Sequence, residues 1–201
     1  QTRGGCSCAG TYGHFLLKTG ISHPMRDEVL ESMSTDFMEV TDYLTGDIPE
    51  NKSLWYQKQM THHILELDDL SWIKKLKNTF LIRHPKDVIL SYMKKFDLEE
   101  ELIGFQQQDR IYRYVCDFVE SDPIVIDSED ILKDPEKMLT RLCNHLKVPF
   151  HNSMLSWRTG HHSTDGVWGR HWYNNVIKTD SFGEFKEKTN SIPEKYIGIN
   201  N

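Results

Sequence analysis

A short apolar run followed at once by a helical repeat is the clearest hydrophobic pattern in the chain. Residues 79–82 (Thr-Phe-Leu-Ile) have the composition of a buried strand. After a polar turn, apolar side chains recur at helical spacing from Val88 to Phe96. Pro85 suits the first turn of such a helix, because its missing N–H has no helical partner there. The pattern predicts a strand that runs directly into a helix.

Arg83 and Ser91 are the candidate ligand-binding residues of this segment. Arg83 leaves the carboxyl end of the predicted strand, where ligands bind in open α/β sheets. Ser91 follows His84 by about two helical turns, so its side chain points along the same line as the helix start. An arginine and a hydroxyl beside a helix N-terminus favour an anion site. An ordinary strand-to-helix connection with a surface arginine is an equally open interpretation.

Similar patterns along the rest of the chain predict an alternation of helices and strands. A strand over 53–60, an amphipathic helix within 65–77 and the strand over 79–82 together form a right-handed parallel crossover. A helix over 105–120 precedes another buried strand over 124–126. The remaining predicted helices begin at Ser22 and Pro24, at Ser34 or Thr35, and at Asp134 with Pro135.

Composition narrows the class of protein. A chain of 201 residues favours one domain with a real core, and no apolar run approaches the roughly 20 residues of a membrane span. The net charge of −6 gives no general attraction to nucleic acid or to an anionic membrane surface. No signal peptide is visible, and Gln1 is compatible with a processed or truncated start.

The cysteines predict neither a disulfide framework nor a metal site. Cys116 and Cys143 fall on apolar helix faces, which is typical of buried reduced thiols. Cys6 and Cys8 are too close together and too isolated for zinc. We therefore expect a reducing, cytoplasmic location and no metal.

Three segments, in order, resemble sulfotransferases that use 3′-phosphoadenosine 5′-phosphosulfate (PAPS). The first is Arg83-His-Pro-Lys-Asp-Val with Ser91, which is similar to the family's 3′-phosphate-binding segment. The second runs from Asp127-Ser-Glu-Asp-Ile-Leu through Asp134-Pro to Val148-Pro-Phe150 and matches a mainly structural family pattern. The layout from Tyr12 to Trp55 also resembles a bacterial-type sulfotransferase-like group. The resemblance implies that Arg83 and Ser91 hold the donor's 3′-phosphate.

The third segment is the Gly- and Trp-punctuated run over 165–174, which is similar to the C-terminal loop that folds over the donor in this family. The resemblance makes Arg158, Trp168 and Arg170 candidate donor-binding residues. A packed aromatic lid with no ligand is the alternative.

A general base is expected near Lys58-Gln-Met-Thr-His62-His63. Sulfuryl transfer to an alcohol requires removal of the hydroxyl proton, and histidine suits that task near neutral pH. The segment resembles the Lys-Thr-His sequence of cytosolic sulfotransferases, with a longer spacing. The resemblance implies His62 or His63 as the base and Lys58 as the group that steadies charge on the departing oxygen. The alternative is two histidines that cap a strand or begin a loop.

The family's N-terminal loop for the 5′-phosphosulfate has no match in the chain, and residues 1–11 read as irregular. We expect one domain over 12–180 and a polar tail over 181–201. The resemblance implies an α/β fold of the P-loop type, N-terminally incomplete, with a parallel sheet and helices on both faces. It also implies PAPS as co-substrate and a small-molecule hydroxyl or amine as acceptor.

Two alternatives stay open: a non-catalytic relative that binds a nucleotide or a partner, and a P-loop-type small-molecule kinase. A pyridoxal-phosphate enzyme is disfavoured, because no lysine stands in a convincing cofactor setting.

Overall fold

The computed structural model describes residues 10–93, 100–162, 165–187, 191 and 193, which belong to two compact units. Unit 1 is formed by the chain up to Leu76 together with Arg158–Asp180. Unit 2 is formed by Lys77–Trp157 together with Ser181–Asn201. The single domain predicted over 12–180, with its flanking segments 1–11 and 181–201, stays a prediction.

Unit 2 contains a parallel two-stranded sheet made of β1 (Thr79–Ile82) and β2 (Ile124–Asp127). Thr79 pairs with Ile124 and Ile82 with Asp127, so the two strands are in register over their whole length. Phe80 and Ile126 are the buried residues of this pair, whereas the other strand residues are half-buried or exposed. The structure confirms the α/β class and the parallel sheet, but only one residue of each strand is a core residue.

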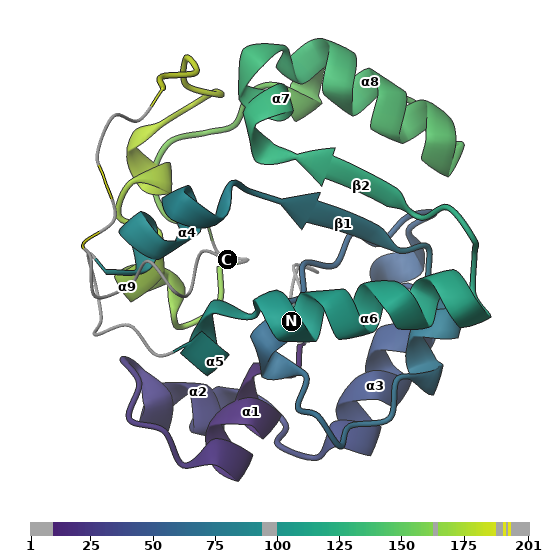
Figure 1. Cartoon of the computed structure of the whole chain (residues 1–201), viewed down its shortest axis with the longest axis vertical. Helices are drawn as coiled ribbons and strands as arrows, with labels where there is room; N and C mark the ends of the chain where they lie inside the picture. The colour runs from purple at the N-terminus through teal and green to yellow at the C-terminus, as the bar shows by residue number, and fades with distance from the viewer. Residues whose placement is uncertain (1–9, 94–99, 163–164, 188–190, 192, 194–201) are drawn as a thin grey trace. The chain divides into compact units, whose positions relative to one another are not determined.

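Helices flank this sheet: α7 (Ser128–Lys133) lies beside β2, and α6 (Phe105–Phe118) lies beside β1 (Figure 1). The Phe80 and Tyr112 rings meet edge to face at 5.3 Å, and Nε2 of Gln108 donates to the Leu81 carbonyl at 3.1 Å. These contacts fix α6 against β1. The α-helices of unit 2 are α4 (Pro85–Tyr92), α5 (Glu100–Ile103), α6 (Phe105–Phe118), α7 (Ser128–Lys133) and α8 (Pro135–Leu146).

The predicted helix starts of unit 2 are correct. Pro85 and Pro135 occupy the first turns of α4 and α8. A carboxylate oxygen of Asp134 accepts from the Lys137 amide at 3.1 Å, which satisfies one of the amides that a helix leaves free at its start. The α6 helix ends at Phe118, two residues before the predicted end. Phe96 lies outside the described residues.

Unit 1 consists of short helices packed around an apolar core. Its α-helices are α1 (Tyr12–Thr19), α2 (Arg26–Ser32), α3 (Phe37–Thr45) and α9 (Gly169–Trp172). Its 3-10 helices are η1 (Pro49–Asn51), η2 (Thr61–His63), η3 (Ser71–Lys75) and η5 (Val176–Lys178). The core is made of Phe15, Leu16, Val29, Val40, Leu44, Ile64, Leu70, Trp72 and Ile73.

The predicted strand over 53–60 is wrong, and with it the predicted crossover. Exposure alternates along this segment as it would in a strand, with Tyr56 outward and Gln57 inward. No strand partner lies beside it in the described residues, and its inward polar groups are not all satisfied: the indole N–H of Trp55 and a side-chain atom of Gln59 are buried without a hydrogen bond. Alternation alone therefore does not make a strand, because the ladder depends on a second segment.

Three further local predictions in unit 1 need correction. The helix expected within 65–77 is only η3, and Leu67 is 97% exposed instead of lying on an apolar face. The α2 helix begins after Met25, which has a left-handed φ of 62°, and not at Ser22 or Pro24. Asp36 caps α3 by accepting from the Glu39 amide at 3.0 Å, because its carboxylate is one residue closer to the helix than Thr35.

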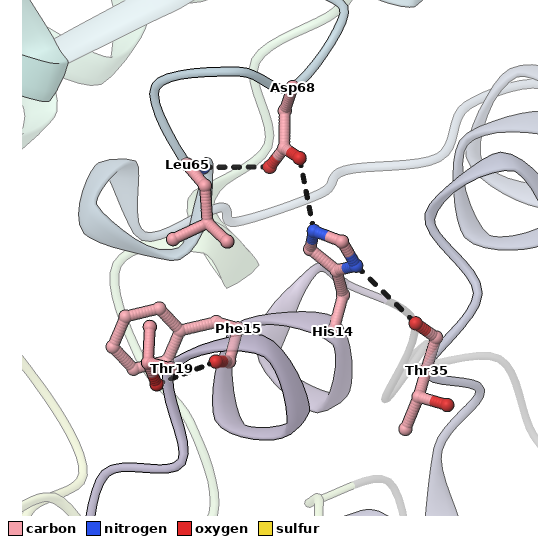
Figure 2. Close-up of polar contacts among 6 residues, drawn as sticks. All are labelled: His14, Phe15, Thr19, Thr35, Leu65 and Asp68. Atoms are coloured by element: carbon pink, nitrogen blue, oxygen red, sulfur yellow. Dashed lines mark hydrogen bonds and ion pairs between the residues drawn. The ribbon is translucent and has the colours of Figure 1, made fainter.

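A buried hydrogen bond joins α1 to the loop before η3. Figure 2 shows the His14 ring between the Asp68 carboxylate and the Thr35 carbonyl, at 3.0 Å and 3.4 Å. The second oxygen of Asp68 accepts from the Leu65 amide at 2.7 Å, which closes the loop on itself. An open hollow of about 520 Å³ lies over this pair and is also lined by Lys18, Glu66 and Leu67.

Candidate functional site

Two adjacent histidines form the centre of an aromatic group in unit 1. The η2 turn brings the rings of His62 and His63 to 4.3 Å between centroids. Tyr12 stacks on His63 at 4.4 Å with an interplanar angle of 3°. The Phe15 ring also contacts both histidines, with ring centroids 4.9 Å from His63 and 5.6 Å from His62. His63 is 9% exposed and His62 is half-buried, so His62 is the more accessible of the two.

Segments far apart in the sequence complete this group. His23 lies with Nδ1 2.6 Å from the Tyr12 hydroxyl oxygen, and its ring stacks on Trp172 at 5.3 Å. Trp168 meets Tyr12 edge to face at 5.8 Å. We call these seven residues the histidine cluster: Tyr12, Phe15, His23, His62, His63, Trp168 and Trp172.

Burial makes the histidines of the cluster weak bases. It lowers the pKa of His62 to about 4, and the nearby His23 lowers it in the same direction. Burial also lowers the pKa of His63 well below its ordinary value, with His62, His23 and Lys58 adding to the effect. The pKa of His23 is lowered as well, mainly by burial. At neutral pH all three rings are therefore uncharged and can accept protons.

The phenol of Tyr12 is correspondingly a poor acid. Burial raises the pKa of Tyr12 to about 12. A hydrogen bond from Trp172 has a smaller effect in the opposite direction. Tyr12 thus keeps its hydroxyl proton at physiological pH and acts as a hydrogen-bond donor within the cluster.

The structure brings together several of the predicted site residues of unit 1. His62, His63 and Trp168 belong to the histidine cluster, and Lys58 is exposed but close enough for its charge to act on His63. Arg158 and Arg170 have exposed side chains, and Arg170 lies in α9 two residues after Trp168.

Sequence reasoning missed Tyr12, His23 and Trp172 as site residues. Tyr12 and His23 both lie in the segment from Tyr12 to Trp55 with its family-like layout, and no local pattern in the sequence indicates that their side chains meet. Their contact depends on how α1, the loop before α2 and α9 pack, which a single sequence does not specify.

Arg83 and Ser91 lie in unit 2 and are both exposed. Arg83 directly follows β1, as predicted, and Ser91 lies in the last turn of α4. His84 already satisfies the first amides of α4: its Nδ1 accepts from the Lys86 amide at 3.2 Å, and its carbonyl accepts from Asp87 and Val88. Any anion held here would therefore be bound by the two side chains and not by the helix amides. Phosphate binding by Arg83 and Ser91 stays a prediction.

The described residues contain neither a candidate metal site nor a candidate membrane-spanning helix. No group of three or more His, Cys, Asp or Glu side chains in this part of the chain could hold a metal ion. No helix in the same residues is long and apolar enough to cross a membrane. Cys116 and Cys143 are free thiols. Cys143 is buried as predicted, whereas Cys116 is only half-buried. Cys6 and Cys8 lie outside the described residues.

Comparison with known proteins agrees with the resemblance. A family model described as a sulfotransferase domain matches residues 8–193. Two Arabidopsis thaliana proteins, named branched-chain-amino-acid aminotransferase-like proteins 1 and 2, are 32% identical over 189 residues and 31% identical over 186 residues. These matches cover 94% and 92% of this chain but 34% and 31% of the relatives, so the chain spans about a third of their length. No solved structure matches the chain. Because the family model covers most of the sequence, the chain belongs to the sulfotransferase domain family.

Proposed function

We propose that the protein transfers a sulfuryl group from PAPS to a hydroxyl or amine of a small-molecule acceptor. The observation that carries this proposal is the histidine cluster: His62 is an uncharged, half-buried proton acceptor in a chain of the sulfotransferase family. Proton removal requires an uncharged ring, and a bound anion that raises the low pKa of His62 would make this ring a stronger base.

His62 is a better candidate for the base than His63. His63 is almost completely covered, with Tyr12 stacked on one side and Phe15 close by. His62 is more accessible and has Phe15 only at its edge. We assign proton removal to His62 and assign to His63 the packing that holds His62 in place.

PAPS supplies the sulfuryl group, by in-line displacement through a loose transition state in which catalysis is mostly positioning and charge stabilisation. The acceptor oxygen forms a bond to sulfur while the bond from sulfur to the bridging phosphate oxygen breaks. His62 takes the acceptor's proton, and the Lys58 ammonium faces the charge that develops on the departing oxygen. Arg83 and Ser91 hold the donor's 3′-phosphate through their side chains, and Arg158, Trp168 and Arg170 contribute cations and an aromatic surface.

The aminotransferase part of the relatives' names is not carried over to this chain. The chain spans only about a third of those relatives, and over that span it matches a sulfotransferase domain. The free thiols of Cys116 and Cys143 favour a reducing compartment, so we propose a cytoplasmic location.

A non-catalytic role is the second candidate. Such a protein would bind a nucleotide at Arg83 and Ser91 without turnover. Binding and turnover therefore have to be measured separately.

Calorimetric titration with adenosine 3′,5′-bisphosphate tests the donor site. We expect binding to the wild type, and a loss of at least about 2 kcal/mol in Arg83→Ala, which is the size of a charge-assisted contact. Arg141→Ala is the matched control, since Arg141 is an exposed arginine on α8. Absence of binding to the wild type would overturn the donor-site assignment.

A turnover assay with labelled PAPS and mixed alcohol and amine acceptors then decides between the two candidates. We expect product from the wild type and a loss of turnover in His62→Gln with adenosine bisphosphate binding retained. Binding without turnover in the wild type would favour the non-catalytic role.

A further inference from the structure

The Tyr12 hydroxyl lies between two side chains that the proposed chemistry has not used, Trp172 and His23. The Trp172 side chain hydrogen-bonds the Tyr12 oxygen, and an indole N–H can only donate. On the other side, Nδ1 of His23 is 2.6 Å from the same oxygen. The Tyr12 oxygen therefore accepts one hydrogen bond, and its own O–H still needs an acceptor.

Counting donors and acceptors assigns the protonation of His23. The Tyr12 phenol keeps its proton, and in the described part of unit 1 the acceptor within reach of that proton is Nδ1 of His23. If Nδ1 carried a proton instead, the oxygen would face two donors and its own buried O–H would lose its acceptor, which is unfavourable. The uncharged ring then carries its proton on Nε2.

Several other groups act on the His23 ring. The pKa of His23 is lowered first by burial and then by the charge of His171, while a backbone contact with Pro24 acts in the opposite direction. Proline has no N–H, so that contact is a carbonyl, which favours a ring N–H. Trp172 covers a face of the ring. A protonated His23 would act electrostatically on His62 and His63, because its charge lowers their pKa values.

We propose that Tyr12 is a positioning residue of the histidine cluster, which keeps His23 as the neutral Nε2–H tautomer so that His62 is the ring that takes the proton. A hydrogen bond donated to the bare nitrogen of a neutral imidazole stabilises that form against protonation. A charged His23 would oppose protonation of His62, which is the event required when the acceptor loses its proton. The Tyr12 ring also stacks on His63, the residue next to the proposed base His62. The catalytic part of this inference rests on the proposed function, whereas the tautomer does not.

Histidine tautomers can be read directly by long-range ¹H–¹⁵N correlation NMR on the full chain, with His23→Gln identifying the His23 signals. We expect the wild type to show the Nε2–H tautomer at neutral pH. In Tyr12→Phe, which keeps the ring stacked on His63, we expect mixed tautomers and protonation of His23 at a higher pH. Tyr43→Phe is the matched control, because Tyr43 is half exposed and outside the cluster. An Nδ1–H tautomer in the wild type overturns the proposal by itself, without any variant having to fold.

Kinetic measurements distinguish a positioning role of Tyr12 from a general structural role. We expect Tyr12→Phe to lower kcat by about tenfold, the size of effect expected from losing one hydrogen bond. We also expect it to shift the acidic limb of the pH profile upward, with adenosine bisphosphate affinity changed less than about twofold. A Tyr12→Phe variant with the wild-type tautomer and pH profile would overturn the proposal. If the wild type has no turnover, the proposed function fails, while the NMR result still decides the tautomer.

Discussion

Nε2 of His14 lies 3.0 Å from Oδ1 of Asp68, and this contact joins the first helix of the chain to a loop more than fifty residues later. His14 is 4% exposed, so losing its partner would leave a buried polar atom unsatisfied. Asp68 also holds the Leu65 amide at 2.7 Å. The carboxylate thus satisfies two donors from different elements and helps to keep α1, which carries Tyr12 and Phe15, in place.

Removing this carboxylate should destabilise the protein measurably. We expect Asp68→Ala to lower the free energy of unfolding by about 2–3 kcal/mol, because two donors lose their acceptor. Asp68→Asn retains one acceptor oxygen and should cost about half as much. Urea unfolding measures both changes. Asp47→Ala, at an exposed aspartate, is the control and should stay within about 0.5 kcal/mol of the wild type. An equally small change in Asp68→Ala would contradict the role of the contact.

Local sequence signals predicted some elements well. The β1 strand, the proline of α4 and the Asp134 cap of α8 each depend on residues within one or two turns of one another. The strand over 53–60 failed for the opposite reason: its alternation is visible in the sequence, but its pairing depends on another segment. A one-residue error at the cap of α3 arose because Ser34, Thr35 and Asp36 are all good caps.

The residues of the histidine cluster also divide into those that the sequence predicts and those that it does not. His62 and His63 could be predicted because they follow Lys58 in a family-like segment, and proton transfer calls for a histidine. The partners of these rings could not be predicted, because Tyr12, His23 and Trp172 come from separate elements and share no sequence pattern. The exposure that distinguishes His62 from His63 is also a property of tertiary packing, which left the two alternatives open in the sequence.

Close packing at Gly13 gives a second stability prediction. A Cβ at this position of α1 would lie 2.8 Å from the Ser34 carbonyl oxygen and 3.2 Å from Cβ of Met33. Alanine normally favours a helix over glycine by about 1 kcal/mol, yet here the backbone must move. We expect Gly13→Ala to be destabilising by about 1–3 kcal/mol in urea unfolding. Gly183→Ala, where the added Cβ meets nothing within 4 Å, is the matched control. A stabilised Gly13→Ala would show that α1 does not pack against residues 33–34 in this way.

The low pKa of His62 predicts a pH-dependent stability. Its value of about 4 in the folded chain lies below the unfolded value of 6.5, so the unfolded chain binds more protons between these limits. Stability therefore falls as the pH is lowered from about 6.5 to about 4, and is unaffected by His62 above that window. At roughly 1.4 kcal/mol for each pKa unit, His62 alone contributes about 3 kcal/mol of this loss.

Urea unfolding across this pH range tests the linkage in two variants. His62→Gln should flatten the stability profile below pH 6.5, whereas His145→Gln, at an exposed position on α8, should leave it unchanged. A profile equally steep in His62→Gln and wild type would mean that His62 is not held neutral by the fold.

The same low pKa supplies a test of whether the donor and His62 act at one site. An anion bound beside His62 favours the imidazolium form, so it should raise the pKa of His62 and cause proton uptake at about pH 5.5, where the free ring is uncharged. Calorimetric titration of adenosine 3′,5′-bisphosphate in buffers of different ionisation enthalpy counts these protons. We expect an uptake of up to about one proton in the wild type, a smaller uptake in His62→Gln, and no change in His145→Gln. Binding without any proton uptake in the wild type would separate the donor from His62, and the base would then have to be sought elsewhere in the chain.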